Sequence, residues 1–141
     1  MDEAVRRAIY ALASDGMESD AAFDQVAPAL LQFGEDDLAE RLMAAAADAP
    51  WEGIAAFLNI ASWDVSSAAE SQIFRTIEAW LADPKDLRRV QVALHVEVIP
   101  FMKQGADPAA LEQVLANVAA TFPETAPRCR HVLEQAQMLK R

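Results

Sequence analysis

Residues 87–102 read LRRVQVALHVEVIPFM, the longest run of the chain in which apolar residues occupy every side of a helix. Leu87, Val90 and Leu94 fall on one helical face, and Val92 and Val96 fall roughly opposite. A helix that is apolar all round is normally buried, with neighbours on both faces. We therefore expect a buried helix over residues 86–104 around which the other helices pack.

The same stretch also fits a strand. Its apolar residues from position 90 to position 98 alternate strictly with Gln91, Ala93, His95 and Glu97, and such alternation is typical of β-structure. A strand needs a hydrogen-bonding partner, and no second strand pattern occurs in the chain. The alternative to the helix is thus an edge strand that pairs with the same strand of a second copy. A homo-oligomer is therefore one of the two alternatives for this stretch.

The composition indicates the all-α class. Of the 141 residues, 53% are hydrophobic, and much of that fraction is alanine, the best helix former. A chain of this length buries roughly two thirds of its unfolded surface and can fold without disulfides or bound metals. We expect one all-helical domain over residues 1–141, with about seven or eight helices in a compact antiparallel array.

Two parts of the chain share a pattern. Val26-Ala27-Pro28, Gly34 and Pro50 recur as Val98-Ile99-Pro100, Gly105 and Pro123. In each copy a proline-containing helix ends in glycine, and an Asp-capped helix follows and ends at proline. Repeated helix pairs are typical of an α-solenoid. The units loosely resemble HEAT-type repeats, but the Asp-then-Val-Arg core of that pattern is absent.

Cap and turn residues predict where the helices begin and end. A second helix is expected to start near Ser19 or Asp20, and its inward residues are expected to be Phe23, Val26, Ala27, Leu30 and Phe33. Pro28 is expected to kink or break that helix near residues 26–27. Two capping boxes are expected at later helix starts, pairing Asp37 with Glu40 and Ser67 with Glu70. Asp83-Pro84 is expected to begin the central helix.

Residues 50–63 form a second candidate for a buried helix. The sequence WEGIAAFLNIASW is apolar nearly all round, and Pro50 suits the first position of a helix. All three tryptophans, Trp51, Trp63 and Trp80, fall on or beside apolar faces, and core packing is the expected use of each. Trp51 follows a turn, so it is the one of the three best suited to anchor an interface instead.

The net charge of −10 is unevenly distributed. Residues 1–83 contain 16 acidic and 4 basic residues, a net of −12, whereas residues 84–141 contain 6 acidic and 8 basic residues, a net of +2. An acidic half disfavours nucleic acid and anionic membranes and favours basic partners. The plainer alternative is that these acids serve solubility, since many lie in first helical turns, where the helix dipole favours them.

This charge distribution predicts a non-catalytic module that binds a basic protein. Small acidic helical proteins of this class include inhibitors and immunity proteins that block nucleases or toxins with cationic clefts. The expected contacts are acids around the early helix junctions, together with the tryptophan named above: Asp20, Asp24, Glu35, Asp36, Asp37, Glu40 and Trp51. The alternative is a helical ligand-binding domain or an enzyme with a pocket near His95.

Motifs for cofactors and metals are missing from the sequence, so we expect neither. His131 and Glu134 alone do not make a zinc site, and residues 35–37 lack the ligand spacing of a calcium loop. The first residues have no long apolar core, unlike a signal peptide, and no segment approaches the ~20 apolar residues that span a bilayer. The expected compartment is the cytoplasm.

Cys129 is the candidate with most chemical interest. Arg128, Arg130 and His131 surround it in sequence, and cations near a helix start lower the pKa of a thiol. Cys129 nevertheless shares its helical face with apolar residues, whereas the arginines fall outside that face. We expect a buried and inert thiol.

Overall fold

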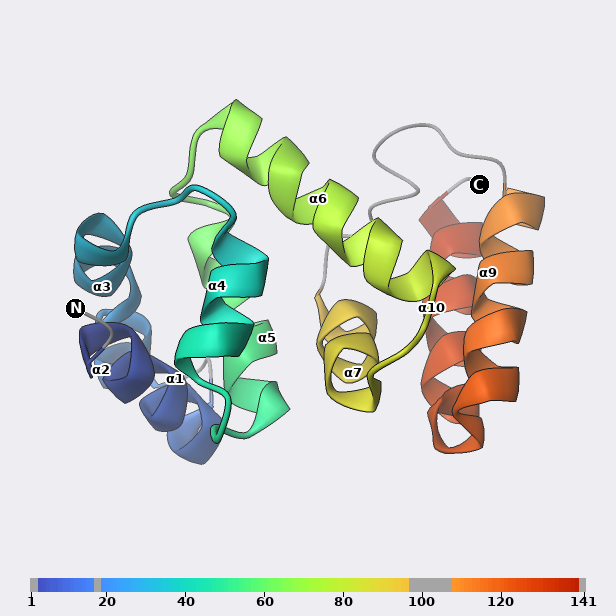
Figure 1. Ribbon diagram of the computed structural model, residues 1–141, viewed down its shortest axis with the longest axis horizontal. Coiled ribbons are helices and arrows are strands. Elements are labelled where there is room, and N and C mark those ends of the chain that lie inside the picture. Colours follow the sequence, from blue (N-terminus) through green and yellow to red (C-terminus); the bar gives the residue numbers. More distant parts are fainter. Residues whose placement is uncertain (1–2, 17–18, 97–107, 140–141) are drawn as a thin grey trace. The chain divides into compact units, whose positions relative to one another are not determined.

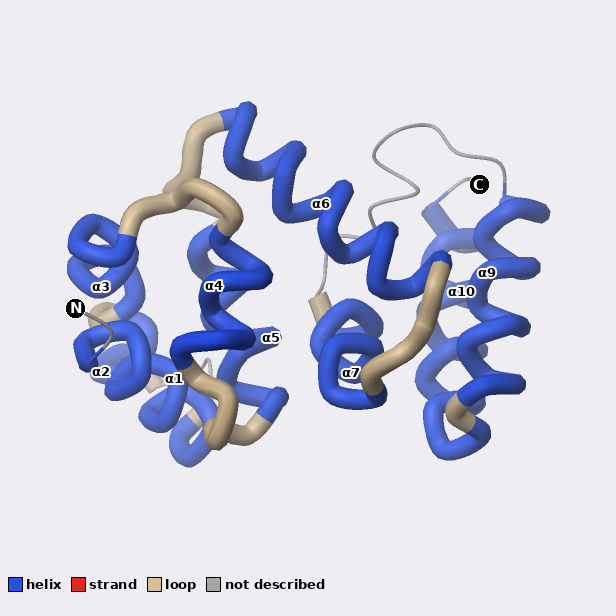
Figure 2. Tube along the Cα trace, in the orientation of Figure 1, coloured by secondary structure: helices blue, strands red, loops and turns tan. Residues whose placement is uncertain are grey.

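The computed structural model describes residues 3–16, 19–96 and 108–139. Every regular element in these ranges is a helix, so the predicted all-α class is confirmed (Figures 1 and 2). The contacts divide the chain into two compact units, Met1–Thr76 and Ile77–Arg141, and the boundary falls within α6. The second copy of the sequence repeat depends on Val98, Pro100 and Gly105, which lie outside the described residues.

The N-terminal unit is built around α5. It contains α1 Glu3–Asp15, α2 Asp20–Phe23, α3 Val26–Phe33, α4 Leu38–Ala45, α5 Trp51–Ala61 and the first part of α6 Ser67–Ala82. Eight of the 11 residues of α5 are buried, as its apolar pattern predicts. α1 packs along α5 most closely at Gly53, where the helix backbones approach each other without an intervening side chain.

The predicted second helix is two helices. α2 ends at Phe23, two turn residues follow, and α3 begins at Val26. The break precedes the position expected from Pro28, because a proline in the first turn of α3 loses no helical hydrogen bond. The turn also carries Phe23 away from the buried face of α3, and Phe23 is 47% exposed. Ala27 is exposed as well, so the prediction that both residues face inward is wrong.

The helix caps agree with the sequence in part. Ser19 caps α2, because its Oγ accepts a hydrogen bond from the Ala22 N–H at 3.3 Å. The capping box at Asp37 is wrong, because this residue adopts a left-handed conformation with φ +49° and its side chain makes no cap bond. For α6, the capping hydroxyl belongs to Ser66 rather than Ser67, and it accepts from the Ala69 N–H at 3.2 Å.

The C-terminal unit contains the end of α6, α7 Leu87–His95, α9 Pro108–Thr121, the 3₁₀ helix η1 Pro123–Thr125 and α10 Ala126–Leu139. α9 and α10 lie side by side around η1, and α7 also contacts α10. The Arg128 Nε donates to the Leu94 carbonyl oxygen at 2.9 Å, which ties α10 to the end of α7.

The opening stretch is helical over its first part. α7 covers residues 87–95, so the strand alternative is wrong there. Asp86 begins this helix by accepting a hydrogen bond from the Arg88 N–H, and Asp83-Pro84 do not. The predicted single helix to residue 104 is wrong at Val96, whose backbone is extended (ψ 122°), so the helical hydrogen bonding ends at His95. Residues 97–104 lie outside the described part of the chain.

Candidate functional site

The connection between α3 and α4 carries three consecutive acids, and Arg41 holds its backbone in place. We name residues 34–37 the acidic loop. The Arg41 guanidinium donates to three carbonyl oxygens, those of Phe33, Gly34 and Asp36, the last at 2.9 Å. The same guanidinium lies 4.1 Å from the Phe33 ring centroid. Helical side chains lean toward the helix N-terminus, which lets Arg41 reach back over the loop.

Two further contacts anchor the loop to α6 and to the residue before it. The Gln72 Oε1 accepts a hydrogen bond from the Asp37 N–H at 2.8 Å. Glu35 accepts from Ser66 twice, from the hydroxyl at 2.8 Å and from the N–H at 3.3 Å. The carboxylates of Asp36 and Asp37 are exposed and make no ion pair within the described part of the chain. The loop thus has a fixed backbone and two outward negative charges.

The structure does not bring all the predicted contact residues together. Asp20 is exposed at the start of α2 and Asp24 is exposed in the turn after it, before α3, whereas the acidic loop follows α3. The eight residues of α3 separate these groups by ~12 Å along the helix axis. Glu40 is half-buried in the first turn of α4.

The tryptophans are distributed differently from the prediction. Trp51 is half-buried and begins α5, at the end of α4 opposite the acidic loop. Trp63 is 84% exposed, so its predicted place in the core is wrong. The reason is that α5 ends at Ala61, and the tight turn in which the Trp63 N–H donates to Ile60 takes this residue off the buried face. Trp80 is buried as predicted.

A pocket of about 280 Å³ adjoins the acidic loop. Its lining combines apolar residues of α3 with the loop and the turn after α5: Ala27, Leu30, Leu31, Gly34, Glu35 and Asp64. The turn after α5 reaches the loop because the α3–α4 and α5–α6 connections lie at the same end of this unit (Figures 1 and 2). Sequence reasoning missed Arg41, although it is the single basic residue between Arg7 and Arg75.

Three of the four arginines of the N-terminal unit, Arg6, Arg7 and Arg41, make hydrogen bonds or ion pairs. The two terminal nitrogens of the Arg6 guanidinium donate hydrogen bonds to the Asp48 carboxylate at 3.0 Å, and these bonds lower the pKa of the Asp48 carboxyl below its usual value. Arg7 pairs with Glu3 at 3.1 Å. Arg41 donates to carbonyl oxygens of the acidic loop. None of these three arginines therefore forms an ion pair with the exposed carboxylates of that loop.

His95 lies at the last position of α7 and is half-buried. Its Nδ1 lies 2.8 Å from the Gln91 carbonyl oxygen of the same helix. A basic side chain at a helix C-terminus interacts favourably with the helix dipole. These contacts describe a histidine that is bound to its own helix.

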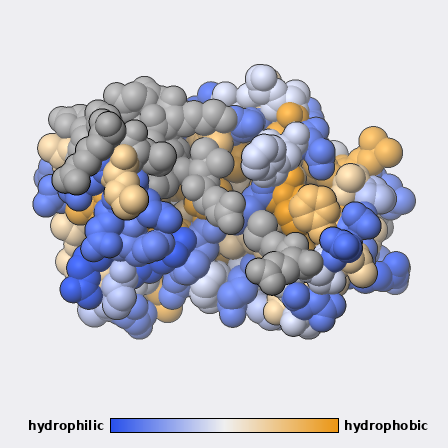
Figure 3. All heavy atoms as spheres, turned by 180° about the vertical axis from the view of Figure 1, so that it is seen from behind, coloured by the Kyte–Doolittle hydropathy of each residue, from blue (hydrophilic) through white to orange (hydrophobic). Residues whose placement is uncertain are grey.

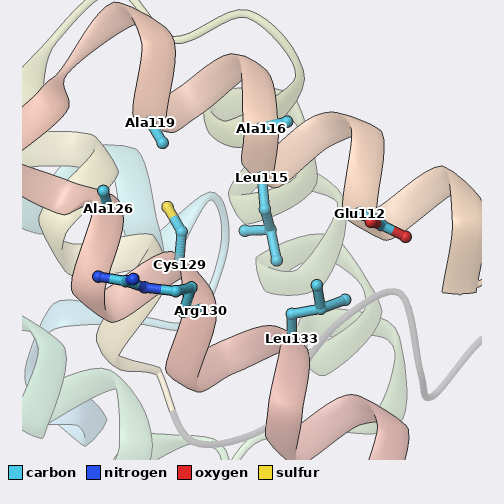
Figure 4. A pocket seen from close by; sticks show the side chains of 8 residues that line it. All are labelled: Glu112, Leu115, Ala116, Ala119, Ala126, Cys129, Arg130 and Leu133. Atoms are coloured by element: carbon cyan, nitrogen blue, oxygen red, sulfur yellow. The ribbon is translucent and has the colours of Figure 1, made fainter.

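Cys129 lines a groove of about 370 Å³ between α9 and α10 (Figure 4). Leu115 of α9 and Leu133 of α10 point toward each other across the groove, and the Cys129 sulfur points toward α9. Cys129 is 4% exposed, which confirms the expected burial. Burial raises the pKa of the thiol, and the Thr125 hydroxyl at 3.7 Å opposes that shift more weakly. The arginine that precedes it is bound to Leu94 instead.

We predict that Cys129 reacts slowly in the native protein. A raised pKa leaves little thiolate at neutral pH, and the thiolate is the reactive form. A chromogenic thiol reagent added at neutral pH should react fully only after denaturation. Prompt reaction of the folded protein would contradict this prediction and indicate an activated thiol.

Comparisons of the chain with family models, with curated proteins and with solved structures gave no match. Among the described residues, no three side chains of His, Cys, Asp or Glu lie together as a metal ion would require. Within the same ranges, no helix has the length and apolar character needed to cross a membrane. The geometry of the acidic loop is therefore the main guide to function.

Proposed function

We propose that this protein is a non-catalytic binding module whose acidic N-terminal half binds a basic protein. The observation that carries this proposal is the acidic loop, whose anchored backbone holds two exposed carboxylates that make no ion pair with any described residue. Binding costs less when the contacting segment is already ordered. The net of −12 over residues 1–83 would also draw a basic partner toward this half.

An inhibitor or immunity-type role is the specific form of this proposal. Such a protein would cover a cationic cleft, and a loop that projects outward charges suits that task. The proposal includes a finer architecture of stacked helix pairs, as in an α-solenoid. The sequence repeat supports this arrangement. Asp20 and Asp24 would form a second contact beyond α3 if the partner surface is broad.

The test begins with affinity capture of the physiological partner, followed by measurement of its association rate from low to high salt. The rate should fall steeply, because exposed charges are screened over ~8 Å at physiological ionic strength. Asp36→Asn with Asp37→Asn should slow association by about tenfold. Asparagine is chosen because it tolerates the left-handed backbone at position 37, whereas lysine would be strained there.

The matched control removes the same charge from the C-terminal unit, with Glu112→Gln and Glu134→Gln, both exposed in the structure. This control should leave the association rate within about twofold at physiological ionic strength, since salt screens exposed charges that lie away from the contact. A separate pair, Asp20→Asn with Asp24→Asn, measures the second group of acids. An acidic or neutral partner, or a rate that is indifferent to salt and to all these variants, would mean that the charge serves solubility.

A further inference from the structure

The pocket beside the acidic loop has the size of a side-chain site. Its volume of about 280 Å³ lies at the lower limit of the ~300–1,000 Å³ typical of small-molecule pockets. Its apolar lining comes from Ala27, Leu30 and Leu31 of α3. A site of this kind suits one apolar side chain of another molecule better than a whole cofactor.

One exposed large apolar side chain lines this pocket, and a second directly precedes a lining residue in the sequence. Leu31 lines the pocket and is 87% exposed, and Trp63 directly precedes the lining residue Asp64 and is 84% exposed. Single exposed apolar residues are ordinary, but these two accompany a concave apolar site. Figure 3 shows hydrophobic atoms that are open to solvent among hydrophilic ones on the face it draws. Tryptophan is also enriched among residues that dominate binding energy at interfaces.

The polar part of the pocket is acidic. Glu35 and Asp64 both contribute to its lining, and Asp64 makes no ion pair within the described ranges. Arg41, the base nearest to Glu35 along the chain, has its donors directed at the loop carbonyls. A pocket lined by apolar and acidic residues is complementary to an apolar group that lies between cations.

We propose that this pocket receives an aliphatic or aromatic side chain of a protein partner, flanked in the partner's sequence by lysine or arginine. The apolar side chain would lie against Leu31 and Trp63, and the flanking cations would pair with Asp64 and with the outward carboxylates of the acidic loop. This inference rests on the proposed function and adds to it the site and the sequence character of the partner.

The probe is a library of short random peptides displayed on phage and selected against the full chain at low salt. Enriched peptides should contain an apolar residue between basic ones. Their affinity should fall by about tenfold or more in Leu31→Ser and in Trp63→Ser, because hot-spot residues contribute at least that much. Both side chains are exposed, so these variants should keep the parental circular dichroism spectrum and melting temperature.

The control variant is Met138→Ser, which removes another exposed apolar side chain in the C-terminal unit. It should bind the selected peptides as the parent does. Basic peptides that lack an apolar residue, or that bind Leu31→Ser and Trp63→Ser unchanged, would overturn the pocket while leaving the electrostatic proposal intact. Enrichment of acidic or neutral peptides, or no enrichment, would also overturn it. The association experiment with the captured partner then decides separately whether the acidic loop binds a basic protein.

Discussion

Gly53→Ala is expected to destabilise the N-terminal unit, although alanine ordinarily stabilises the interior of a helix by ~1 kcal/mol relative to glycine. The reason is the close approach of α1. A Cβ atom at position 53 would lie 2.3 Å from the Ile9 carbonyl oxygen, 2.9 Å from the Ile9 Cγ2 and 3.1 Å from the Ala13 Cβ. The nearest of these atoms belongs to the backbone, so the helices themselves must move apart.

Overpacking of this kind costs about 1–3 kcal/mol or more, so the sign of the effect is opposite to that of helix propensity. The measurement is thermal and urea unfolding followed by circular dichroism. Glu52→Ala is the matched control, because Glu52 is exposed on the same helix, and it should stay within ~0.5 kcal/mol of the parent. Adding Ile9→Ala should not restore stability, since the backbone oxygen remains. A Gly53→Ala protein as stable as the parent would show that α1 and α5 are further apart.

Phe57→Ala is expected to lower stability by ~3–5 kcal/mol. Phe57 is 0% exposed and heads the large side chains that are fully buried, and it lies in the middle of α5. Truncation removes its apolar contacts and leaves a cavity that the surrounding helices fill only partly. The loss should appear as a lower urea midpoint, and the slope against urea should be unchanged if the unfolded state is unaffected.

Phe57→Leu is the control for this prediction. It retains most of the apolar volume, so it should cost clearly less than the alanine variant. Comparable losses in the two variants would indicate that the ring's shape matters more than its volume. A Phe57→Ala protein within ~1 kcal/mol of the parent would contradict a core centred on α5.

Periodicity was sufficient to predict the helical class and the burial of α5. Its apolar residues leave hardly any polar face, and a helix of that kind must be enclosed. The same reasoning extends the helix of residues 87–95 too far, because the apolar residues keep helical spacing beyond His95 whereas the backbone is extended at Val96. Periodicity describes which residues share a face and says little about where hydrogen bonding ends.

The candidate surface could be predicted only in part. Charge counting finds Glu35, Asp36 and Asp37, since a sum over the sequence needs no geometry. The anchoring by Arg41 depends on a side chain that turns back over the loop, and the exposure of Trp63 depends on α5 ending two residues before it. Both features come from local backbone geometry, which composition and spacing do not encode.

The anchoring of the acidic loop separates its shape from its charge. The bonds that Arg41 makes are to carbonyl oxygens, so they do not depend on which residue stands at position 36. The positive φ of Asp37 accommodates asparagine or glycine as well. The charge of the acidic loop can therefore be removed at position 37, and removed or reversed at position 36, while the contacts of Arg41 to the backbone stay the same. Charge and backbone shape can thus be changed independently in this loop, by natural substitution or by design.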